Sequence, residues 1–322
     1  GLRYTLDKDF TQWYAFKGGV NYDYFIPEYE FLNSAINESR YSPFILNKLH
    51  FNRFETHLKF RYTYVEGYNP PLMPSVLFRY KIQENVENKI YLDFSVAKGF
   101  KLPTLNERYW IPGGNIDVLP EESEQYELSL IASQGIFGLT LKFYEIQLNN
   151  AVQWLEMDSV WSDIENRWHY NTYSPENINR LNSRGINALF KHDYLPLYIL
   201  DLQNEIAYNH NVSINPETGR RSPYSPENSI AYNMYLKKNN WTARMNYQWI
   251  DKRWFQSNEL DQYALVNADL MYEFAFASYR FQTCFSVKNI ADINYQSILN
   301  RAMPGRHYLF TIKLNHNFYE AI

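Results

Sequence analysis

The residues best suited to chemistry form an aromatic run between positions 150 and 181. The run contains Trp154, Trp161, Trp168, His169, Tyr170 and Tyr173. Flat aromatic rings bind large, partly apolar ligands, and the polar edges of these rings add hydrogen bonds. A second, shorter group consists of Arg108, Tyr109 and Trp110. Both groups predict non-covalent ligand binding; the alternative is that these rings pack within their loops or lie at a membrane interface.

The histidines and the cysteine show no catalytic or metal-binding pattern. The histidines are scattered and form no H-E-x-x-H pair: His50, His57, His169, His192, His210, His307 and His316. No G-x-S-x-G or G-x-x-x-x-G-K-[ST] motif occurs either. The single Cys284 excludes an intrachain disulfide and a multi-cysteine zinc site. We therefore expect a protein that is not an enzyme and that has no intrinsic cofactor or metal.

The composition narrows the class of protein. Aromatic residues make up 18% of the 322-residue chain, and a net charge of -4 gives no reason to expect a nucleic-acid partner. Mean hydropathy is -0.51, and no apolar run approaches the roughly 18–20 residues of a spanning helix. A helical membrane protein is thus excluded. No apolar signal segment opens the chain, which begins at Gly1 in what we interpret as the middle of a domain.

Alternation of apolar and polar residues recurs from end to end, and it predicts β-strands. In residues 264–276, for example, Leu270 belongs to the apolar set and Asn267 to the polar set, and Phe285 is apolar in the following strand. About thirteen strands are expected, near residues 12–24, 53–65, 75–84, 89–98, 124–133, 137–149, 182–193, 197–209, 228–237, 240–250, 263–276, 279–289 and 306–318. Lengths of about 10–13 residues fit tilted transmembrane strands better than the mean globular strand of about 5–6.

The connections alternate in length, as they do in outer-membrane barrels with long extracellular loops and short periplasmic turns. The long ones cover residues 99–123, 150–181, 210–227, 251–262 and 290–305, and the tight ones lie at residues 133–135, 193–196, 237–240 and 277–278. We therefore predict an all-β, transmembrane antiparallel β-barrel whose last strand runs toward the periplasm. Six carboxylates are expected to face its lumen: Asp93, Glu127, Asp201, Glu205, Asp269 and Glu273. A soluble β-sandwich or jelly roll is the alternative.

Three segments resemble one known family. The stretch "GFKLPTLNERYW…GGNIDVLPEESEQYEL" is similar to the mid-barrel signature of TonB-dependent outer-membrane receptors, and the segments "SPENINRLNSRGINALF" and "VKNIADINYQ…PGRHYLFTIKLNHNF" are similar to a later barrel entry and to the closing hairpin, residues 279–318. The signature residues are Gly99, Phe100, Pro103, Asn115, Pro120, Glu121, Gly305, Arg306 and Phe318. Ile116 and Val118 depart from the family pattern, and residues 319–322 extend past its usual terminal Phe.

The resemblance implies a function and partners. Family members import a scarce, large ligand across the bacterial outer membrane, such as an iron–siderophore, haem or cobalamin, and this chain is somewhat closer to the cobalamin and siderophore type. Import is driven through TonB, which acts from the periplasmic side on the N-terminal part of the receptor. Outer-membrane lipid, lipopolysaccharide and a surface lipoprotein are further expected partners, and nucleic acid is not. A barrel without a plug that serves as an adhesin, a scaffold or a secretion-complex component is the alternative.

The resemblance also implies that the chain is incomplete. Transporters of this family have a plugged barrel of about 22 strands, of which residues 1–322 are expected to supply the C-terminal thirteen or so, without the plug domain. Counting back from the last strand makes residues 12–24 run toward the periplasm, with an unusually long link over residues 25–52. Either residues are absent there, or the link hides a further strand, for which residues 42–49 are the candidate.

Overall fold

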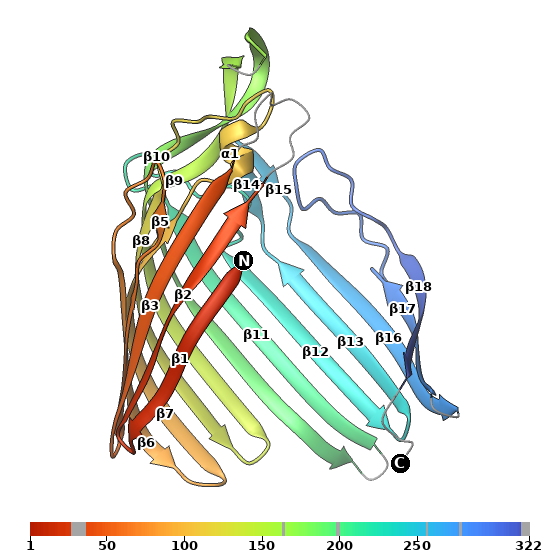
Figure 1. Ribbon diagram of the computed structural model, residues 1–322. Coiled ribbons are helices and arrows are strands. Elements are labelled where there is room, and N and C mark those ends of the chain that lie inside the picture. Colours follow the sequence, from red (N-terminus) through yellow and green to blue (C-terminus); the bar gives the residue numbers. More distant parts are fainter. Residues whose placement is uncertain (27–36, 163–164, 198–199, 256, 277–278, 317–322) are drawn as a thin grey trace.

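The computed structural model describes residues 1–26, 37–162, 165–197, 200–255, 257–276 and 279–316. These residues form a 16-stranded antiparallel sheet, a separate two-stranded sheet and one short helix. The large sheet curves strongly, so that its first and last strands lie on the same open side (Figure 1). The predicted all-β fold is confirmed.

The strands are long and follow one another in chain order. Their bounds are β1 Leu2–Thr11, β2 Tyr14–Phe25, β3 Glu38–Phe51, β4 Phe54–Arg61, β5 Tyr64–Val65, β6 Met73–Glu84, β7 Asn88–Lys101, β8 Glu121–Gln134, β9 Phe137–Ser162, β10 Arg167–Leu197, β11 Leu200–Ile214, β12 Asn228–Lys238, β13 Trp241–Ile250, β14 Arg253–Phe255, β15 Asn258–Leu260, β16 Tyr263–Phe276, β17 Tyr279–Lys288 and β18 His307–His316, and helix α1 is Leu105–Tyr109. Every strand of the main path pairs with its nearest neighbours in sequence, β5 adds to β3, and β14 pairs with β15.

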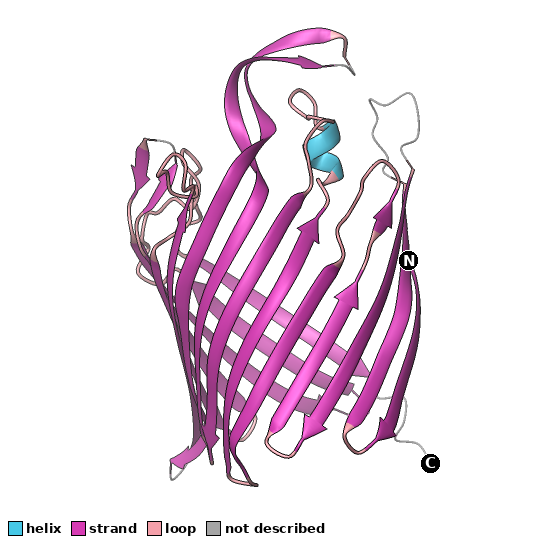
Figure 2. Cartoon of the chain, turned by 90° about the vertical axis from the view of Figure 1, so that its left-hand side faces the viewer, coloured by secondary structure: helices cyan, strands magenta, loops and turns pink. Residues whose placement is uncertain are grey.

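Long and short connections separate to opposite ends of the sheet, as predicted. Residues 102–120, 215–227, 251–262 and 289–306 all lie at one end, whereas two-residue turns join β8 to β9 and β12 to β13 at the other (Figures 1 and 2). In these turns Gly135 and Asn239 adopt φ values of 53° and 51°. Positive φ at such positions is what a two-residue hairpin requires. The end with the long connections is called the loop end below, and the other is the turn end.

The predicted strand count was too low. Strand β1 was not predicted at all, and β3 occupies the region that was left as a long link. The candidate strand at residues 42–49 is confirmed, since it lies within β3. With β3 in place, residues 12–24 run toward the loop end rather than toward the turn end, so the predicted direction of that strand was wrong. The predicted strand 53–65 is divided into β4 and β5.

The largest correction concerns residues 150–181, which were expected to form a loop. Strands β9 and β10 instead continue through this segment, and their pairing extends to Ser162 and Arg167. The resulting hairpin projects beyond the other connections (Figures 1 and 2). The predicted turn at residues 193–196 is also wrong, because Leu195 and Leu197 still pair with Leu202 and Leu200 of β11. The predicted turn at residues 277–278 lies outside the described residues.

The strand register divides the sheet into two faces. One face, called the apolar face, carries the in-register row Ala243, Leu270, Phe285 and Phe310 across β13, β16, β17 and β18. Leu270, Phe285 and Phe310 are 45%, 47% and 66% exposed. Other side chains of the described residues therefore leave much of this apolar row uncovered. Large apolar surface of this kind needs an apolar surrounding. The predicted lipid-facing set is therefore on one continuous face.

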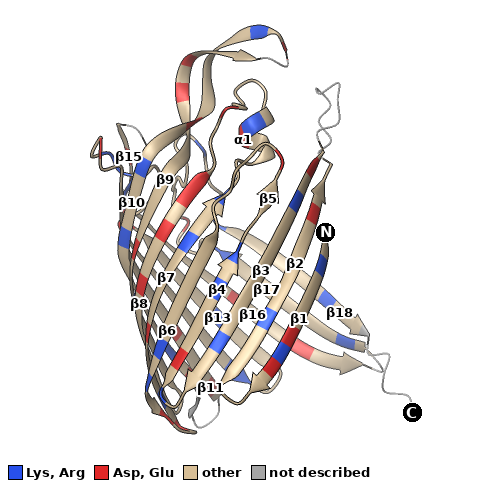
Figure 3. Cartoon of the chain, turned by 60° about the vertical axis from the view of Figure 1, so that its left-hand side comes forward, with Lys and Arg blue, Asp and Glu red and all other residues tan. Residues whose placement is uncertain are grey.

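The opposite face, called the polar face, carries hydrogen-bonded polar side chains. Asn246 donates to Asn233 and Asn267 donates to Asn246, both at 3.0 Å, in a ladder across three strands. Arg79 binds Asp93 through two hydrogen bonds of 2.8 and 2.7 Å. Figure 3 shows that acidic and basic residues are both present on the strands around β6 to β10. The six carboxylates predicted to face the lumen all belong to this face by register.

The sheet has two edges in the part of the chain that the structure describes. Strand β1 pairs with β2 alone and β18 with β17 alone, and every residue of β1 is exposed. Within the same described ranges, no helix has both the length and the apolar character needed to cross a membrane.

Candidate functional site

The loop between β7 and β8 is organised around helix α1. Thr104 caps the helix, because its Oγ1 accepts a hydrogen bond from the Glu107 backbone N–H at 3.1 Å. The Glu107 carboxylate in turn accepts from the Thr104 backbone N–H at 2.6 Å. This reciprocal pair is a capping box, which the sequence Thr-Leu-Asn-Glu encodes locally. The helix therefore has a fixed start, and it presents Arg108 and Tyr109 on its last turn.

Arg108 ties this helix to a distant strand. Its guanidinium donates to Glu38 at the loop end of β3, and the two residues are only 7% and 8% exposed. The same guanidinium lies 5.7 Å from the Tyr68 ring centroid and 5.3 Å from that of Tyr109. Although burial acts to raise it, the hydrogen bonds from Arg108 and Arg40 hold the pKa of the Glu38 carboxyl below its usual value. In the structure Arg108 holds the loop to β3; the ligand contact predicted for it from the sequence stays a prediction.

Glu38 belongs to the polar face, since its neighbour along that face of β3 is Arg40 and Arg40 also binds it at 2.6 Å. Residues 102–120 must therefore fold over the polar side of the sheet to bring Arg108 to Glu38. Between β7, where this loop begins, and β3 lie β4 and β6. The loop thus crosses above several strands at the loop end. Neither Glu38 nor Arg40 was predicted as functional, because both fall in the stretch interpreted as a link.

The other side of the same loop is fastened to the base of the β9–β10 hairpin. Asn177 accepts from the Leu119 backbone N–H at 2.7 Å, and its amide donates to the carbonyls of Leu119 and Asn150 at 3.0 and 2.8 Å. The Asn115 amide donates to the Pro175 carbonyl at 3.1 Å. The rim is defined here as residues 102–120 together with residues 150–152 and 173–177. Hydrogen bonds join residues 102–120 to the base of the hairpin.

The signature residues explain why the rim is compact. Pro103 is fully buried, Glu121 is 9% exposed, and the Glu121 carboxylate accepts from the Val152 backbone N–H at 2.8 Å. A Cβ on Gly113 would overlap the Tyr173 carbonyl, so only glycine allows this approach. Of the other signature residues in this region, Gly99 and Phe100 lie near the end of β7, Asn115 binds the Pro175 carbonyl, and Pro120 precedes β8. Val118, one of the departures from the family pattern, is 2% exposed and packs inside the rim.

Replacing Asn177 with alanine should loosen the rim without unfolding the sheet. Three hydrogen bonds would be lost, each worth about 1 kcal/mol, and two of them hold the backbone of Leu119. We expect amide hydrogen exchange at Leu119 to rise by about tenfold or more, while exchange in β12 and β13 stays unchanged. Asn179→Ala is the matched control, because its single bond to Glu217 at 2.8 Å lies outside the rim. Equal exchange at Leu119 in both variants would contradict the clamping role.

The aromatic run of the hairpin does not converge on one site. Trp161 and Trp168 face each other at the tip, with ring centroids 5.6 Å apart and planes at 66°. Trp154 pairs with Pro175, seven residue pairs nearer the sheet, which at about 3.3 Å per residue places it roughly 23 Å from the tip pair. One ligand therefore cannot contact the whole predicted set. Tyr170 is 70% exposed near the tip, and Tyr173 is 43% exposed at the base.

His169 lies against the carboxylate of Glu165. Its Nε2 lies 2.6 Å from a Glu165 carboxylate oxygen, and Arg167 binds the same carboxylate at 2.9 Å. Arg167 and His169 lower the pKa of Glu165 below its usual value. His169 therefore shapes the hairpin tip. Its partner Glu165 could not be recognised from the aromatic pattern alone.

A second set of loop contacts surrounds Arg253, which is only 3% exposed. Its guanidinium donates to the carbonyls of Asp261 at 3.2 Å, Gln296 at 3.0 Å and Ser297 at 3.4 Å. It thereby joins the connections 251–262 and 289–306. This role could not be predicted from residue types, since the acceptors are backbone atoms.

The predicted closing hairpin is present as β17 and β18. Arg306 donates its backbone N–H to Asp292 at 2.7 Å, and a Cβ on Gly305 would lie 2.8 Å from the same carboxylate. Buried Asn289 donates to the carbonyl of Ile293 at 2.9 Å and receives a hydrogen bond from its N–H. Gly305 and Arg306 therefore fix the connection before β18. Phe318 lies outside the described residues.

The rim leaves several apolar side chains uncovered. Trp110 is 52% exposed, Ile116 is 56% exposed and Leu119 is 54% exposed, although all three belong to a well-bonded loop. Together with Tyr173 they form the candidate binding surface. Of the residues predicted from sequence, Trp110 and Tyr173 lie on the rim with solvent-facing rings, while Tyr109 faces Arg108. Ile116 and Leu119 were not predicted, because aliphatic residues in a loop carry no distinctive pattern.

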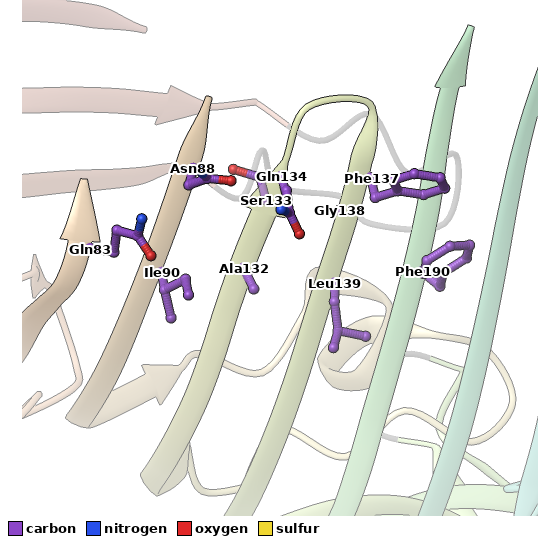
Figure 4. Close-up of a pocket in the computed structure, with 10 residues that line it drawn as sticks. All are labelled: Gln83, Asn88, Ile90, Ala132, Ser133, Gln134, Phe137, Gly138, Leu139 and Phe190. Carbon is purple, nitrogen blue, oxygen red and sulfur yellow. The ribbon is translucent and has the colours of Figure 1, made fainter. Parts of the chain in front are cut away.

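A pocket of about 340 Å³ lies at the opposite end of the sheet (Figure 4). It is bordered by Ile90, Ala132, Leu139 and Phe190, which share the apolar face across β7 to β10. Because it opens beside the β8–β9 turn, it is not part of the rim. In the ranges that the structure describes, no group of three or more His, Cys, Asp or Glu residues is arranged to hold a metal ion.

Comparison with protein families gives a match over most of the chain. The model described as "TonB dependent receptor-like, beta-barrel" matches residues 1–290. The vitamin B12 transporter BtuB of Photobacterium profundum is 28% identical over 102 residues, which are 32% of this chain and 16% of BtuB. The chain therefore aligns with only a small part of this relative.

Solved structures share the fold. The siderophore receptor PirA from Acinetobacter baumannii matches with a TM-score of 0.70 at 14% identity, over 96% of this chain and 53% of PirA. The ferric enterobactin receptor PfeA from Pseudomonas aeruginosa, solved with enterobactin, also has a TM-score of 0.70, at 15% identity and the same coverage. The chain thus spans about half the length of these receptors.

Proposed function

Since the chain belongs to the TonB-dependent receptor β-barrel family, we propose that it forms part of an outer-membrane receptor that imports a scarce, large ligand. The family places the sheet in the outer membrane, with the apolar face toward lipid and the polar face toward the lumen. The loop end is then extracellular, because long connections lie outside and short turns lie in the periplasm. The rim then lies on the extracellular side, below the projecting β9–β10 hairpin (Figures 1 and 2).

The observation that carries this proposal is the rim itself. The loop 102–120 bonds to β3 on one side and to β10 on the other and is held over the polar face, yet Trp110 of the loop and Tyr173 of β10 stay exposed. Exposed aromatic rings on a rigid support bind a ligand at low entropic cost. A receptor entrance accounts for both the rigidity and the exposure.

The ligand class follows from the chemistry of the rim. Flat rings and aliphatic side chains suit a large, partly apolar chelate rather than a simple ion. An iron–siderophore, haem or cobalamin fits this description. Relatives support the class: BtuB is a vitamin B12 transporter, and PirA and PfeA are siderophore receptors. Energy would come through TonB at the periplasmic side, as the family implies.

Truncating the two rim aromatics should weaken ligand binding. The double change Trp110→Ala with Tyr173→Ala removes two stacking faces worth about 0.5–1.5 kcal/mol each, so affinity should fall by about tenfold or more. Titration of the full-length receptor with ferric enterobactin, haem and cyanocobalamin, followed by tryptophan fluorescence, measures the change. Trp168→Ala at the hairpin tip is the matched control and should bind as tightly as the unaltered receptor. The reverse ranking would move the binding surface to the tip.

The alternative function is that of an adhesin or scaffold. The projecting hairpin favours it, because Trp161, Trp168 and Tyr170 are 41%, 54% and 70% exposed beyond the other loops. An exposed aromatic arm is suited to docking another protein. Under this alternative, loss of the tip would abolish partner binding, while the Trp110 and Tyr173 variants would change nothing.

A further inference from the structure

The projecting hairpin and helix α1 are each held by a cluster of charged residues at the loop end. The first cluster lies at the base of the hairpin, where Glu121 is 9% exposed and accepts from the Val152 N–H at 2.8 Å. The second lies between α1 and β3, where Arg108 and Arg40 both bind Glu38. Figures 1 and 2 show the hairpin rising beyond α1, so the first cluster lies at the foot of an arm that stands above the helix.

Lys101 joins the two clusters. It is the last residue of β7 and lies opposite Glu121 in the register. Its Nζ lies 2.8 Å from a Glu121 carboxylate oxygen and 3.8 Å from a Glu107 carboxylate oxygen. Glu107 directly precedes Arg108 in α1. One ammonium group therefore bridges the base of the hairpin and the helix that is anchored on β3.

The connected charges alternate in sign from β8 to β3. Three carboxylates and three cations follow one another in the order Glu121, Lys101, Glu107, Arg108, Glu38 and Arg40. Glu121, Arg108 and Glu38 are at most 9% exposed, so solvent and salt screen these members weakly. Charges in such a network depend on one another, because removing one leaves its neighbours unbalanced. A change at one end should therefore affect the other end.

The capping box of α1 is the point at which Lys101 can act on the helix. One oxygen of the Glu107 carboxylate accepts from the Thr104 N–H at 2.6 Å, and the other oxygen faces Lys101. Without the charge of Glu121, the ammonium group would move to Glu107 and compete with the Thr104 N–H. The start of α1 would then loosen. The Arg108 N–H would loosen with it, because it donates to the Thr104 carbonyl at 3.1 Å.

We propose that Lys101 is a positioning residue that couples the base of the hairpin to the β3 anchor of the rim, so that contact with the hairpin regulates how readily the rim opens. Such coupling is reciprocal, so a change at Glu38 should also loosen Val152. The inference rests on the proposed function only in treating the rim as the binding surface. The hydrogen bonds of Asn115 and Asn177 form a second connection between the same elements, which the test must separate from Lys101.

The test is a double-mutant cycle read by hydrogen–deuterium exchange of the full-length receptor in detergent. Glu121→Gln removes a charge but keeps an acceptor for the Val152 N–H. We expect it to raise exchange at Arg108 by about two- to fivefold, the effect of losing one ion pair. In a Lys101→Met background the same change should have no effect at Arg108, because the bridging ammonium is gone. Lys101→Arg should restore the effect, since a guanidinium can donate to two carboxylates.

The reverse cycle reads the other end of the chain of charges. Glu38→Gln should raise exchange at Val152 by a similar factor, and only when Lys101 is present. Glu124→Gln is the matched control, because Glu124 forms a 2.8 Å ion pair with Lys98 between the same two strands but on the apolar face. It should leave exchange at both ends unchanged.

Three results would overturn the proposal. Glu121→Gln could raise exchange at Arg108 equally with and without Lys101, which would assign the connection to the hydrogen bonds of the rim. It could leave exchange at Arg108 unchanged, or Glu124→Gln could raise it by the same factor. Electrophoretic heat-modifiability and unchanged exchange in β12 and β13 establish that each variant is folded. No ligand is added, so failure of the import proposal would leave this result interpretable.

Discussion

Lysine in place of Leu270 should lower the free energy of unfolding from a bilayer by about 2–4 kcal/mol and so destabilise the barrel. Leu270 is paired with Phe285 on the apolar face, and both side chains are about half exposed with no protein cover. A charged amine in that position would have to enter hydrocarbon or distort the bilayer around it. Phe285→Lys should have an effect of the same size. Urea titration of the refolded barrel in phospholipid vesicles measures both.

The neighbouring residue provides the control. Met271 follows Leu270 in β16 but belongs to the polar face, where it pairs with Cys284 and Thr242. Met271→Lys should therefore cost much less than Leu270→Lys. Asn267, which the alternation alone would suggest as a control, is unsuitable because it bonds Asn246 and the backbone of Asn289. Equal destabilisation by lysine at 270 and 271 would show that the two faces are assigned incorrectly.

Removing the Glu38 carboxylate should open the rim. Glu38→Ala leaves the guanidinium of Arg108 buried without its partner, and loss of one member of a buried pair costs about 3–5 kcal/mol. Because the contact joins a loop to a strand, we expect local opening of residues 102–120 rather than global unfolding. Hydrogen exchange at the backbone amides of Arg108 and Trp110, which close α1 at 3.1 and 3.0 Å, reports this opening. Arg167→Ala breaks an exposed pair at the hairpin tip and should leave that exchange unchanged.

The same contact predicts a pH dependence. The pKa of Glu38 is below its ordinary value of 4.5 in the folded state. Its stabilising contribution is therefore complete above the unfolded-state pKa and is lost as the pH falls through the lower folded-state value. Exchange at Arg108 should stay slow at neutral pH and rise only under acidic conditions, after correction for the intrinsic exchange rate. Rim opening that begins above pH 5 would assign the effect to another group.

The overall fold was predictable because the membrane imposes one rule on every strand. Lipid on one side and water on the other force a period of two, so the assignments of Leu270, Phe285 and Trp241 agree with the register. The strands that were missed break this rule locally. Strand β1 places Lys8 on the apolar face, and β3 places Phe44 on the polar face, with Pro43 in mid-strand.

The candidate site was predictable only in part. A loop was expected at residues 99–123, and the connection between β7 and β8 covers residues 102–120, since glycine, proline and a capping box are local signals. The role of Arg108 was not predictable, because its partner Glu38 lies 70 residues away and the contact exists only after the sheet has formed. The same holds for Asn177, which binds Leu119 across 58 residues. The distance between Trp154 and Trp161 could not be predicted from their spacing in the sequence, because the intervening residues form an extended hairpin rather than a compact loop.

The central claim is energy-coupled import, and radiolabelled uptake tests it most directly. Cells that lack their own receptors would express the full-length gene and receive labelled ferric enterobactin, haem or cyanocobalamin, with and without a protonophore. The account predicts accumulation of at least one of these ligands above the empty-vector level, and loss of that accumulation when the proton gradient is removed. Accumulation at the empty-vector level for all three, or uptake that the protonophore does not change, would contradict it.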